Sequence, residues 1–338
     1  MSEKIVVLGA GSWGIAIANL LSENGHRVIM WEFNKTDFEY LKNNRMHEKK
    51  LPGITIADSI SITNDLGDTV VDAAYIVLAI PAQRIRAVCL SLNKFLTGPM
   101  GFINLAKGIE MESLMRMSEV IESVIFPEYI ANGHVATLSG PSHAEEVARH
   151  IPTSVVAASV DVDYARRIQH LFNNRHFRVY RSGDLIGVEL GGALKNIIAI
   201  ASGVTQGLGF GDNTTGALLT RGLAEITRMG VKLGADPLTF AGLSGLGDLI
   251  TTCISRHSRN RFVGDRIGRG EILADILAGM AMVAEGVDTC RSGYAMAGKY
   301  EVEMPITVEV YRILFENKPP GEALADLMGR SLKEEVWS

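Results

Sequence analysis

The chain has 338 residues, of which 47% are hydrophobic and 21% charged, a balance typical of globular proteins and not of disordered ones. Its formal net charge of -5 argues against a nucleic-acid-binding protein, because such proteins neutralise phosphates with a basic surface. At about 150 residues per domain, this length predicts two domains.

The first half of the sequence alternates apolar strands with helices. A helix is expected at Ser12–Glu23, closed by Asn24 and Gly25. The strands are expected at residues 5–11, 27–32, 74–80, 101–108 and 135–142, with 153–159 and 177–182 extending the sheet. Because these strands are apolar on both faces, they predict a doubly wound, parallel α/β sheet covered by helices.

After Ser182 the pattern becomes helical, beginning with a long apolar helix over residues 184–204. The predicted fold class is therefore α/β, with an N-terminal doubly wound sheet followed by an all-helical C-terminal domain. We place the boundary between 1–182 and 183–338.

A glycine pattern, Gly9-x-Gly11-x-x-Gly14, lies between the first strand and the first helix. Gly9 permits a tight turn, Gly11 lets the backbone approach a pyrophosphate, and Gly14 lets the helix pack against the strand. The helix N-terminus offers N–H groups and a partial positive charge to an anion. We favour a dinucleotide-binding Rossmann domain over the alternative of a purely structural turn.

Glu32 ends the second strand, where an acidic side chain meets the adenosine ribose of NAD in such domains. Its carboxylate would repel the 2′-phosphate of NADP, and Phe33 offers an apolar edge for adenine. Lys35 is the main objection, since a flexible lysine could reach that phosphate. We expect NADH to be used at least as well as NADPH. The alternative is that Glu32 is only an exposed charge.

Polar groups also lie in the turns that follow two of the later predicted strands. Lys107 follows a strand, at the end that opens on the ligand crevice of such sheets. Gly140, Pro141 and Ser142 form a strand-to-helix turn that could face an anion or a polar substrate. The alternative for Lys107 is a lysine that simply lies at the surface. The alternative for the turn is an ordinary capped helix, with Ser142 as N-cap and Glu145 at the third helical position.

Lys195 is the only basic residue between Arg181 and Arg221, in a helix too apolar to lie at the surface. Such a lysine either extends outward or is held in a cleft, where burial lowers its pKa and suits it to proton transfer. Gly191 and Gly192 precede it and allow close approach of another group. Asp248 follows a glycine-rich turn and could pair with it, or could simply cap a helix.

Residues 253–270 contain five arginines in an otherwise acidic chain. Ser258, Arg259 and Asn260 are expected at a helix start, where a guanidinium, a hydroxyl and free N–H groups form a phosphate site. Arg266 and Arg269 are expected to face solvent.

The three cysteines, Cys89, Cys253 and Cys290, are far apart and predict neither a disulfide framework nor a metal site. They fit a reducing setting. The N-terminus has no secretory pattern, and no apolar run of about 18 residues is expected to span a membrane. We therefore predict a cytoplasmic protein with no bound metal, no nucleic-acid partner and no stable membrane anchor.

Several longer motifs resemble one family. The segments GAGSWGIAIA, LPGI, AKGIE, SGPSHAEEVA, ELGGALKN, GDNTTGALLTRGLAEITRMG, FAGLSGLGDLITTCISRHSRN and AEGVDT, over roughly residues 5 to 310, are similar to bacterial-type NAD(P)-dependent sn-glycerol-3-phosphate dehydrogenases. The resemblance implies that dihydroxyacetone phosphate and sn-glycerol 3-phosphate are interconverted with NAD or NADP, supplying glycerol 3-phosphate for phospholipid synthesis. We also expect a homodimer.

The same resemblance implies residue roles. Lys195 would be the proton donor and acceptor, with Lys107 and Asp248 beside it. The expected substrate-binding residues are Lys107, Gly140, Ser142, Lys195, Asn196, Asp248, Ser258, Arg259 and Asn260. The expected cofactor-binding residues are Gly9, Gly11, Ser12, Trp13, Gly14, Glu32, Phe33, Lys107, Ala144, Arg259, Val283 and Glu285.

Two other interpretations remain at this point. The chain could be a related two-domain dehydrogenase of a hydroxy acid, although no carboxylate-binding group is evident. It could also be a dinucleotide-binding sensor without catalysis, which gives no reason for Lys195, Asp248 and Arg259 to occur together.

Overall fold

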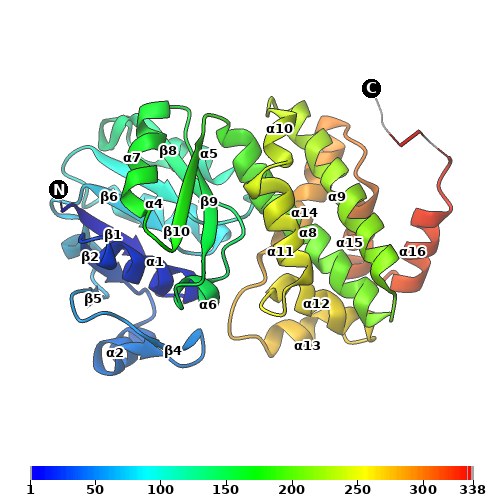
Figure 1. Ribbon diagram of the computed structural model, residues 1–338, viewed down its shortest axis with the longest axis horizontal. Helices are drawn as coiled ribbons and strands as arrows, with labels where there is room; N and C mark the ends of the chain where they lie inside the picture. Colours follow the sequence, from blue (N-terminus) through cyan, green and yellow to red (C-terminus); the bar gives the residue numbers. More distant parts are fainter. Residues whose placement is uncertain (1, 333, 336–338) are drawn as a thin grey trace.

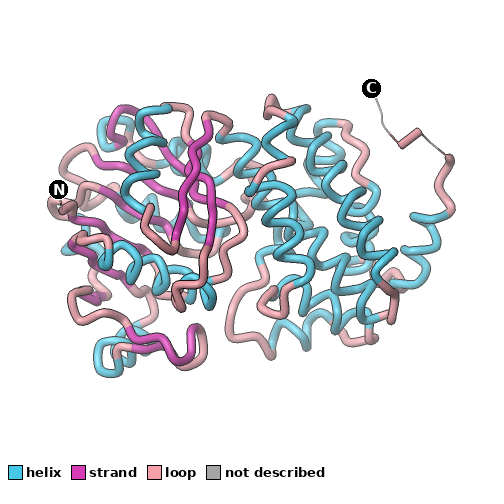
Figure 2. Tube along the Cα trace, in the orientation of Figure 1, coloured by secondary structure: helices cyan, strands magenta, loops and turns pink. Residues whose placement is uncertain are grey.

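The computed structural model describes residues 2–332, 334 and 335. A sheet-containing N-terminal domain lies beside a helical C-terminal domain (Figure 1). Among the described residues, the strands are confined to the first of these domains (Figure 2). The predicted fold class is confirmed.

The N-terminal domain is built on one sheet of eight strands in the order β10-β9-β8-β7-β6-β1-β2-β5. All neighbouring pairs are parallel except β8 and β9, which are antiparallel. The strands are β1 Lys4–Leu8, β2 Arg27–Trp31, β5 Ser61–Thr63, β6 Tyr75–Leu78, β7 Met100–Asn104, β8 Ile130–Ser139, β9 Thr153–Ala158 and β10 Phe177–Ser182. A small antiparallel pair, β3 Met46–His47 and β4 Leu51–Thr55, lies outside this sheet.

Alternating side chains of β1 point to opposite faces of the sheet. Ile5 and Val7 pack in one apolar cluster with α1 and α7, whereas Val6 and Leu8 pack in another with α4 and α5. The helical segments of this domain are α1 Ser12–Glu23, α2 Lys35–Asn44, α3 Leu66–Val70, η1 Ala82–Arg84, α4 Ile85–Leu92, α5 Met117–Val124, η2 Pro127–Tyr129, α6 Ala144–Val147 and α7 Val162–Phe172. The sheet is therefore covered on both sides, as its apolar strands require.

Several strand bounds differ from the expectation. The strand expected at 101–108 ends at Asn104, whose side chain accepts a hydrogen bond from the Ala106 N–H (2.9 Å). The strand expected at 135–142 begins at Ile130 and ends at Ser139. The sequence also did not predict β5, the β3–β4 pair or the antiparallel step. The apolar residues continue past the paired strand into the buried loop that follows it. The apolar pattern of the sequence therefore does not predict where the strand ends.

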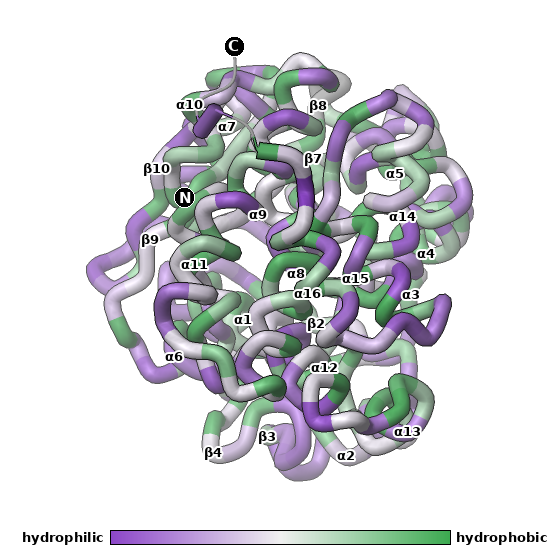
Figure 3. Tube along the Cα trace, turned by 90° about the vertical axis from the view of Figure 1, so that its right-hand side faces the viewer, coloured by the Kyte–Doolittle hydropathy of each residue, from purple (hydrophilic) through white to green (hydrophobic). Residues whose placement is uncertain are grey.

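The C-terminal domain surrounds one buried helix, α8 Leu185–Gly207. Figure 3 shows α8 near the middle of the domain, and α9, α11, α12, α14 and α15 contact it. The other helical segments are α9 Asp212–Lys232, α10 Pro237–Phe240, η3 Leu243–Gly247, α11 Asp248–Ile254, α12 Arg259–Gly268, α13 Leu273–Ala278, α14 Glu285–Tyr300, α15 Pro305–Phe315 and α16 Pro320–Met328.

Within the described part of the chain, two segments are long and apolar enough to span a membrane, contrary to the expectation that none would be. These are Leu185–Gly207 and Pro237–Ile254. In α8, 94% of the apolar window is buried inside the protein, as in the core helix of a globular domain. The second segment is divided between α10, η3 and α11.

Helices α8 and α12 cross so closely that only glycine fits at the contact. A Cβ atom on Gly203 would lie 2.0 Å from the Arg261 carbonyl oxygen, and one on Gly264 would lie 2.0 Å from that of Ile200. Gly207 and Gly268 extend the same contact along the two helices. This crossing places the first turn of α12 beside α8.

We predict that Gly264→Ala lowers the free energy of unfolding by about 1–3 kcal/mol or more, because the added methyl group overlaps the backbone of α8. Gly298→Ala is the matched control, since Gly298 lies in α14 and a Cβ atom there would meet no neighbour within 4 Å. Gly298→Ala should leave the stability unchanged or raise it by about 1 kcal/mol, because alanine favours a helix more than glycine does. Urea unfolding measures both, and equal stabilities would contradict the close crossing.

Candidate active site

Three charged side chains from three separate segments meet between the two domains. Lys107 lies in the loop after β7, Lys195 in the middle of α8, and Asp248 at the start of α11. Nζ of Lys107 donates to one carboxylate oxygen of Asp248 (2.7 Å), and Nζ of Lys195 donates to the other. Lys195 also donates to the hydroxyl of Thr252 (2.7 Å), one turn further along α11.

Burial sets the protonation of this cluster, since Lys195 is 4% exposed and Asp248 2%. Burial lowers the pKa of Lys195 to about 7, while Asp248 opposes that shift and the charge of Lys107 adds to it. Burial acts to raise the pKa of Asp248, but Lys107 and Lys195 together hold it below its usual value. With both lysines protonated, the cluster carries a net positive charge that suits an anion.

Gly191 and Gly192 allow α8 to approach this cluster. A Cβ atom on Gly191 would lie 2.6 Å from the Ser244 carbonyl oxygen, and one on Gly192 would lie 2.6 Å from Oγ of Ser139. The glycine pair therefore packs against the protein itself, between the end of β8 and η3.

The turn at 140–144 joins β8 to α6. The Gly140 carbonyl accepts hydrogen bonds from Nζ of Lys107 and from Oγ of Ser142, both at 2.9 Å. His143, and not Ser142, is the N-cap of α6, which corrects the alternative in which Ser142 capped this helix. Ala144 is the first residue of α6 and is buried.

The start of α12 is shaped as expected. Ser258 is the N-cap, and its hydroxyl accepts from the Arg261 N–H (3.2 Å). The N–H groups of Arg259 and Asn260, in the first turn, have no acceptor within the helix. The guanidinium of Arg259 donates to the Val283 carbonyl (2.8 Å), and the amide oxygen of Asn260 accepts from the Gly286 N–H (2.9 Å).

Outside this first turn, two other arginines of the segment pair with acids. Arg266 pairs with Glu271 and Arg269 with Asp265, and their side chains are 43% and 61% exposed. They face solvent, as predicted.

The glycine loop has the geometry its spacing predicts. Gly9 has a φ of 107°, and a Cβ atom there would lie 2.6 Å from the Ala79 carbonyl oxygen. A Cβ atom on Gly14 would lie 1.9 Å from the Gly9 carbonyl oxygen, so α1 packs directly on the loop. Gly11 has no neighbour within 4 Å of that position, which leaves open space in front of the first turn of α1.

Glu32 is buried beside this loop. Its carboxylate oxygens accept from the N–H groups of Ala10 (3.2 Å) and Asn34 (2.9 Å). Phe33 is 79% exposed, and its ring meets Trp31 edge-on. The structure thus excludes the interpretation of Glu32 as an exposed strand-end charge.

The helical domain extends a loop over the glycine loop. Oγ of Ser12 contacts Sδ of Met282 (3.4 Å), and Glu285 accepts from the Ala82 N–H (3.1 Å). The other carboxylate oxygen of Glu285 is buried and has no partner among the described residues. Burial raises the pKa of Glu285 to about 7, so it can hold a proton or accept a further hydrogen bond near neutral pH.

Two further residues of the site were missed in the sequence. Thr252, four residues after Asp248, could have been found from helical spacing. Glu189 could not, because its partners are distant in the sequence. Glu189 is 6% exposed and accepts hydrogen bonds from Arg116 (2.6 Å), from the backbone and side chain of Ser118 (2.9 and 2.6 Å), and from Thr137 (3.0 Å).

This network ties α8 to the N-terminal domain six residues before Lys195. Asn196 adds a second tie, since its amide nitrogen donates to the Lys107 carbonyl (3.1 Å). Together these contacts set the position of Lys195 relative to Lys107.

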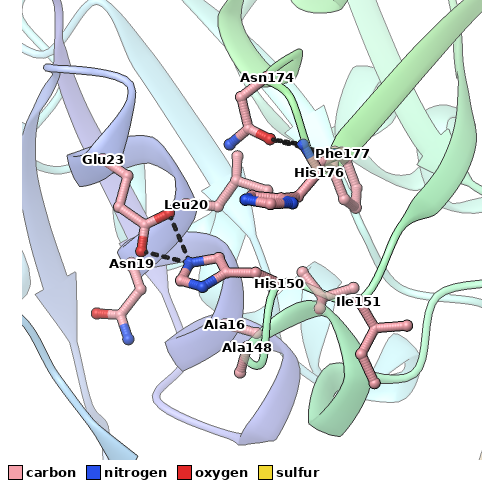
Figure 4. Close-up of a pocket in the computed structure, with 11 residues that line it drawn as sticks. Ala16, Asn19, Leu20, Glu23, Ala148, His150, Ile151, Asn174, His176 and Phe177 are labelled. Carbon is pink, nitrogen blue, oxygen red and sulfur yellow. Dashed lines mark hydrogen bonds and ion pairs between the residues drawn. The ribbon is translucent and has the colours of Figure 1, made fainter.

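A separate small hollow lies between α1 and the start of β10 (Figure 4). His150 pairs there with Glu23 (3.0 Å). None of the expected site residues lines this hollow.

The chain matches known proteins over nearly its whole length. Residues 4–165 match the model of the NAD-dependent glycerol-3-phosphate dehydrogenase N-terminus, and residues 184–325 match that of the C-terminus. Relatives named glycerol-3-phosphate dehydrogenase (NAD(P)+) from Lysinibacillus sphaericus and a Thermoanaerobacter species are 48% and 50% identical, over 99% and 98% of this chain and 98% and 99% of theirs.

A solved structure is also similar. The crystal structure of glycerol-3-phosphate dehydrogenase from Coxiella burnetii is 32% identical with a TM-score of 0.93, covering 97% of this chain and 99% of that one.

We predict that Glu189→Ala destabilises the protein by about 3–5 kcal/mol, because the Ser118 N–H and hydroxyl lose their buried acceptor and Arg116 keeps only Glu119 as a carboxylate partner. The control is Arg269→Ala, which breaks an exposed ion pair and should cost less than about 1 kcal/mol. Denaturant unfolding compares the two variants. A similar small loss for both would show that Glu189 does not hold the domains together.

Proposed function

Because the chain belongs to the NAD-dependent glycerol-3-phosphate dehydrogenase family, we propose that it interconverts dihydroxyacetone phosphate and sn-glycerol 3-phosphate at the Lys107–Asp248–Lys195 cluster. The protein is an NAD(P)-dependent oxidoreductase. The observation that carries the proposed site is the buried Lys195, whose pKa is lowered to about 7 and whose ammonium is held by Asp248 and Thr252.

The residues of the glycine loop suit the dinucleotide. The open space at Gly11 and the first turn of α1, including the backbone N–H groups of Ser12 and Trp13, would hold the pyrophosphate. The indole of Trp13 packs against Phe177 (centroids 6.4 Å apart), so its backbone supplies that contact. Val283 and Glu285 would cover the cofactor from the helical domain, and the unpartnered oxygen of Glu285 provides an acceptor.

When bound beside this cluster, NADH would supply the hydride that reduces the C2 carbonyl carbon of dihydroxyacetone phosphate. Lys195 donates a proton to the carbonyl oxygen, and in the reverse direction it accepts the hydroxyl proton. Lys107 and the protonated Lys195 stabilise the negative charge that develops on that oxygen. Asp248 keeps both ammonium groups in place.

The remaining expected residues would position the substrate. Its phosphate would lie at the first turn of α12, with the N–H groups of Arg259 and Asn260, the Ser258 hydroxyl and the Arg259 guanidinium. Gly140 and Ser142 form the turn beside Lys107, next to Ala144 on the cofactor side. Binding energy at the phosphate orients the carbonyl at Lys195.

Other properties of the chain remain proposals. The division at residue 182 is supported by the end of β10 at Ser182 and the start of α8 at Leu185. We also propose a cytoplasmic homodimer that supplies glycerol 3-phosphate for phospholipid synthesis. The hydroxy-acid and sensor interpretations are set aside, because the relatives above are glycerol-3-phosphate dehydrogenases.

Purified protein mixed with NADH and dihydroxyacetone phosphate tests the proposed function through the loss of nicotinamide absorbance. Pyruvate or ketopantoate as the oxidant tests the hydroxy-acid alternative. Turnover of the keto acid in place of dihydroxyacetone phosphate would refute the proposal.

We predict opposite pH dependences for the two directions. Reduction needs the Lys195 ammonium, so kcat/KM for dihydroxyacetone phosphate should fall as the pH rises above about 7. Oxidation of glycerol 3-phosphate needs the free amine, so its kcat/KM should fall as the pH drops below about 7. Lys195→Ala should lower kcat by about 10²–10⁴-fold and remove this pH dependence.

Because Asp248 keeps Lys107 as a partner in this variant, Lys195→Ala should still fold and bind NADH with nearly unchanged affinity. Fluorescence titration with NADH checks that point. A variant within a few-fold of the wild-type kcat would exclude Lys195 as the proton donor.

We further predict that NADH is used at least as well as NADPH. The carboxylate of Glu32 lies at the glycine loop, where it repels a 2′-phosphate and retains lone pairs for the ribose hydroxyls. Such repulsion is worth on the order of 1–3 kcal/mol at a partly screened site. Steady-state kcat/KM for both coenzymes at one ionic strength measures the ratio, and Glu32→Ala should shift it toward NADPH. A tenfold preference for NADPH in the wild type would disprove the prediction.

A further inference from the structure

His143 carries a buried polar atom that neither the fold nor the proposed mechanism uses. Its Nε2 is shielded from solvent and has no hydrogen-bond partner among the described residues. A buried nitrogen without a partner costs free energy, so folded proteins rarely keep one without a reason. His143 is also the N-cap of α6, yet its side chain makes no capping hydrogen bond.

The position of His143 relates this atom to the site. The residue ends the turn whose Gly140 carbonyl accepts from Nζ of Lys107 (2.9 Å). Its ring lies 5.8 Å from the ring of His257, the residue directly before Ser258 at the start of α12. His143 therefore lies near both the lysine cluster and the proposed phosphate site.

The charges around His143 favour its neutral form. Burial lowers its pKa, and Lys195 and Lys107 lower it further, whereas Glu145 and Asp248 oppose that shift. A neutral imidazole donates a hydrogen bond from one nitrogen without adding a charge beside two lysines.

We propose that His143 is a substrate-binding residue whose Nε2–H donates a hydrogen bond to the substrate phosphate. The inference rests on the proposed function for the identity of the substrate. In dihydroxyacetone phosphate, one carbon and one oxygen atom separate the carbonyl carbon from phosphorus. A molecule with its carbonyl at Lys195 and its phosphate at α12 would bring that phosphate near the His143 ring, because this ring lies beside His257 at the start of α12.

The hydrogen bond would select for phosphorylated substrates. A hydrogen bond to a charged phosphate is stronger than one to a neutral hydroxyl, so the donor favours the phosphorylated molecule. His143, which belongs to the N-terminal domain, would thus add to the selection for phosphorylated substrates that Arg259 and the N-terminus of α12 provide from the helical domain.

The test compares His143→Leu with His143→Gln, because the glutamine amide can place an N–H near the position of Nε2. His143→Leu should raise both KM for dihydroxyacetone phosphate and the inhibition constant of inorganic phosphate by about 10- to 150-fold, with a smaller change in kcat. His143→Gln should restore most of this affinity. His170→Leu, at an exposed position in the last turn of α7, is the control and should change neither constant.

Two outcomes would overturn the inference. One is an unchanged phosphate inhibition constant in His143→Leu, and the other is a loss confined to NADH affinity, which would place the ring against the cofactor. Titration of ¹⁵N-histidine-labelled wild-type protein with inorganic phosphate gives a readout that needs no folded leucine variant, with His143→Gln assigning the signal. An Nε2 resonance of His143 that does not respond to phosphate would also refute the proposal.

The two proposals fail in different experiments. Reduction of dihydroxyacetone phosphate by the wild-type protein decides the proposed function. The phosphate affinity of the variants and the response of the imidazole resonance decide the role of His143, whatever substrate is reduced.

Discussion

The structure depends on one carboxylate, Asp248, that holds two lysines from different domains. Lys107 comes from the sheet domain and Lys195 from the buried helix of the second domain, and each takes one oxygen of Asp248. Burying such charges is costly unless all of them are paired and hydrogen-bonded. The two domains must therefore be docked in one arrangement for the cluster to exist, and Glu189 and Asn196 supply hydrogen bonds that fix this arrangement.

The sheet gathers the N-terminal half of the site at one edge. Strands β1, β6, β7 and β8 are parallel neighbours, so the loops that follow them open on the same side. These loops carry the glycine turn at Gly9, the Ala82 N–H, Lys107 and the turn at Gly140. The helical domain covers the same edge with Glu285, whose carboxylate accepts from the Ala82 N–H, so both domains contribute to the proposed cofactor site.

The same burial that requires pairing also tunes the chemistry. If Lys195 had the pKa of a solvated lysine, it would exchange protons poorly at neutral pH. Burial instead lowers its pKa to about 7. Asp248 prevents a further fall that would leave the amine uncharged. The same electrostatic balance thus fixes the position of Lys195 and gives it a pKa suited to the proton transfer proposed for it in both directions.

The sequence alone predicted the features that depend on local spacing. The glycine turn, the helix over 12–23, the cap at Ser258 and the long helix around Lys195 each follow from neighbouring residues. The motifs of Lys107, Lys195 and Asp248 predicted a shared site through family resemblance. The sequence also raised a pairing of Asp248 with Lys195, which the structure confirms, but no pairing of Asp248 with Lys107.

Only the tertiary structure decided how distant residues meet. That Asp248 joins both lysines and that Glu189 accepts hydrogen bonds from Arg116 and Thr137 are contacts between segments far apart in the chain. The absence of a hydrogen-bond partner for Nε2 of His143 among the described residues likewise depends on the surrounding segments. The direction of a buried side chain is set by what packs around it in three dimensions, and the spacing of residues along one segment contains no record of those neighbours.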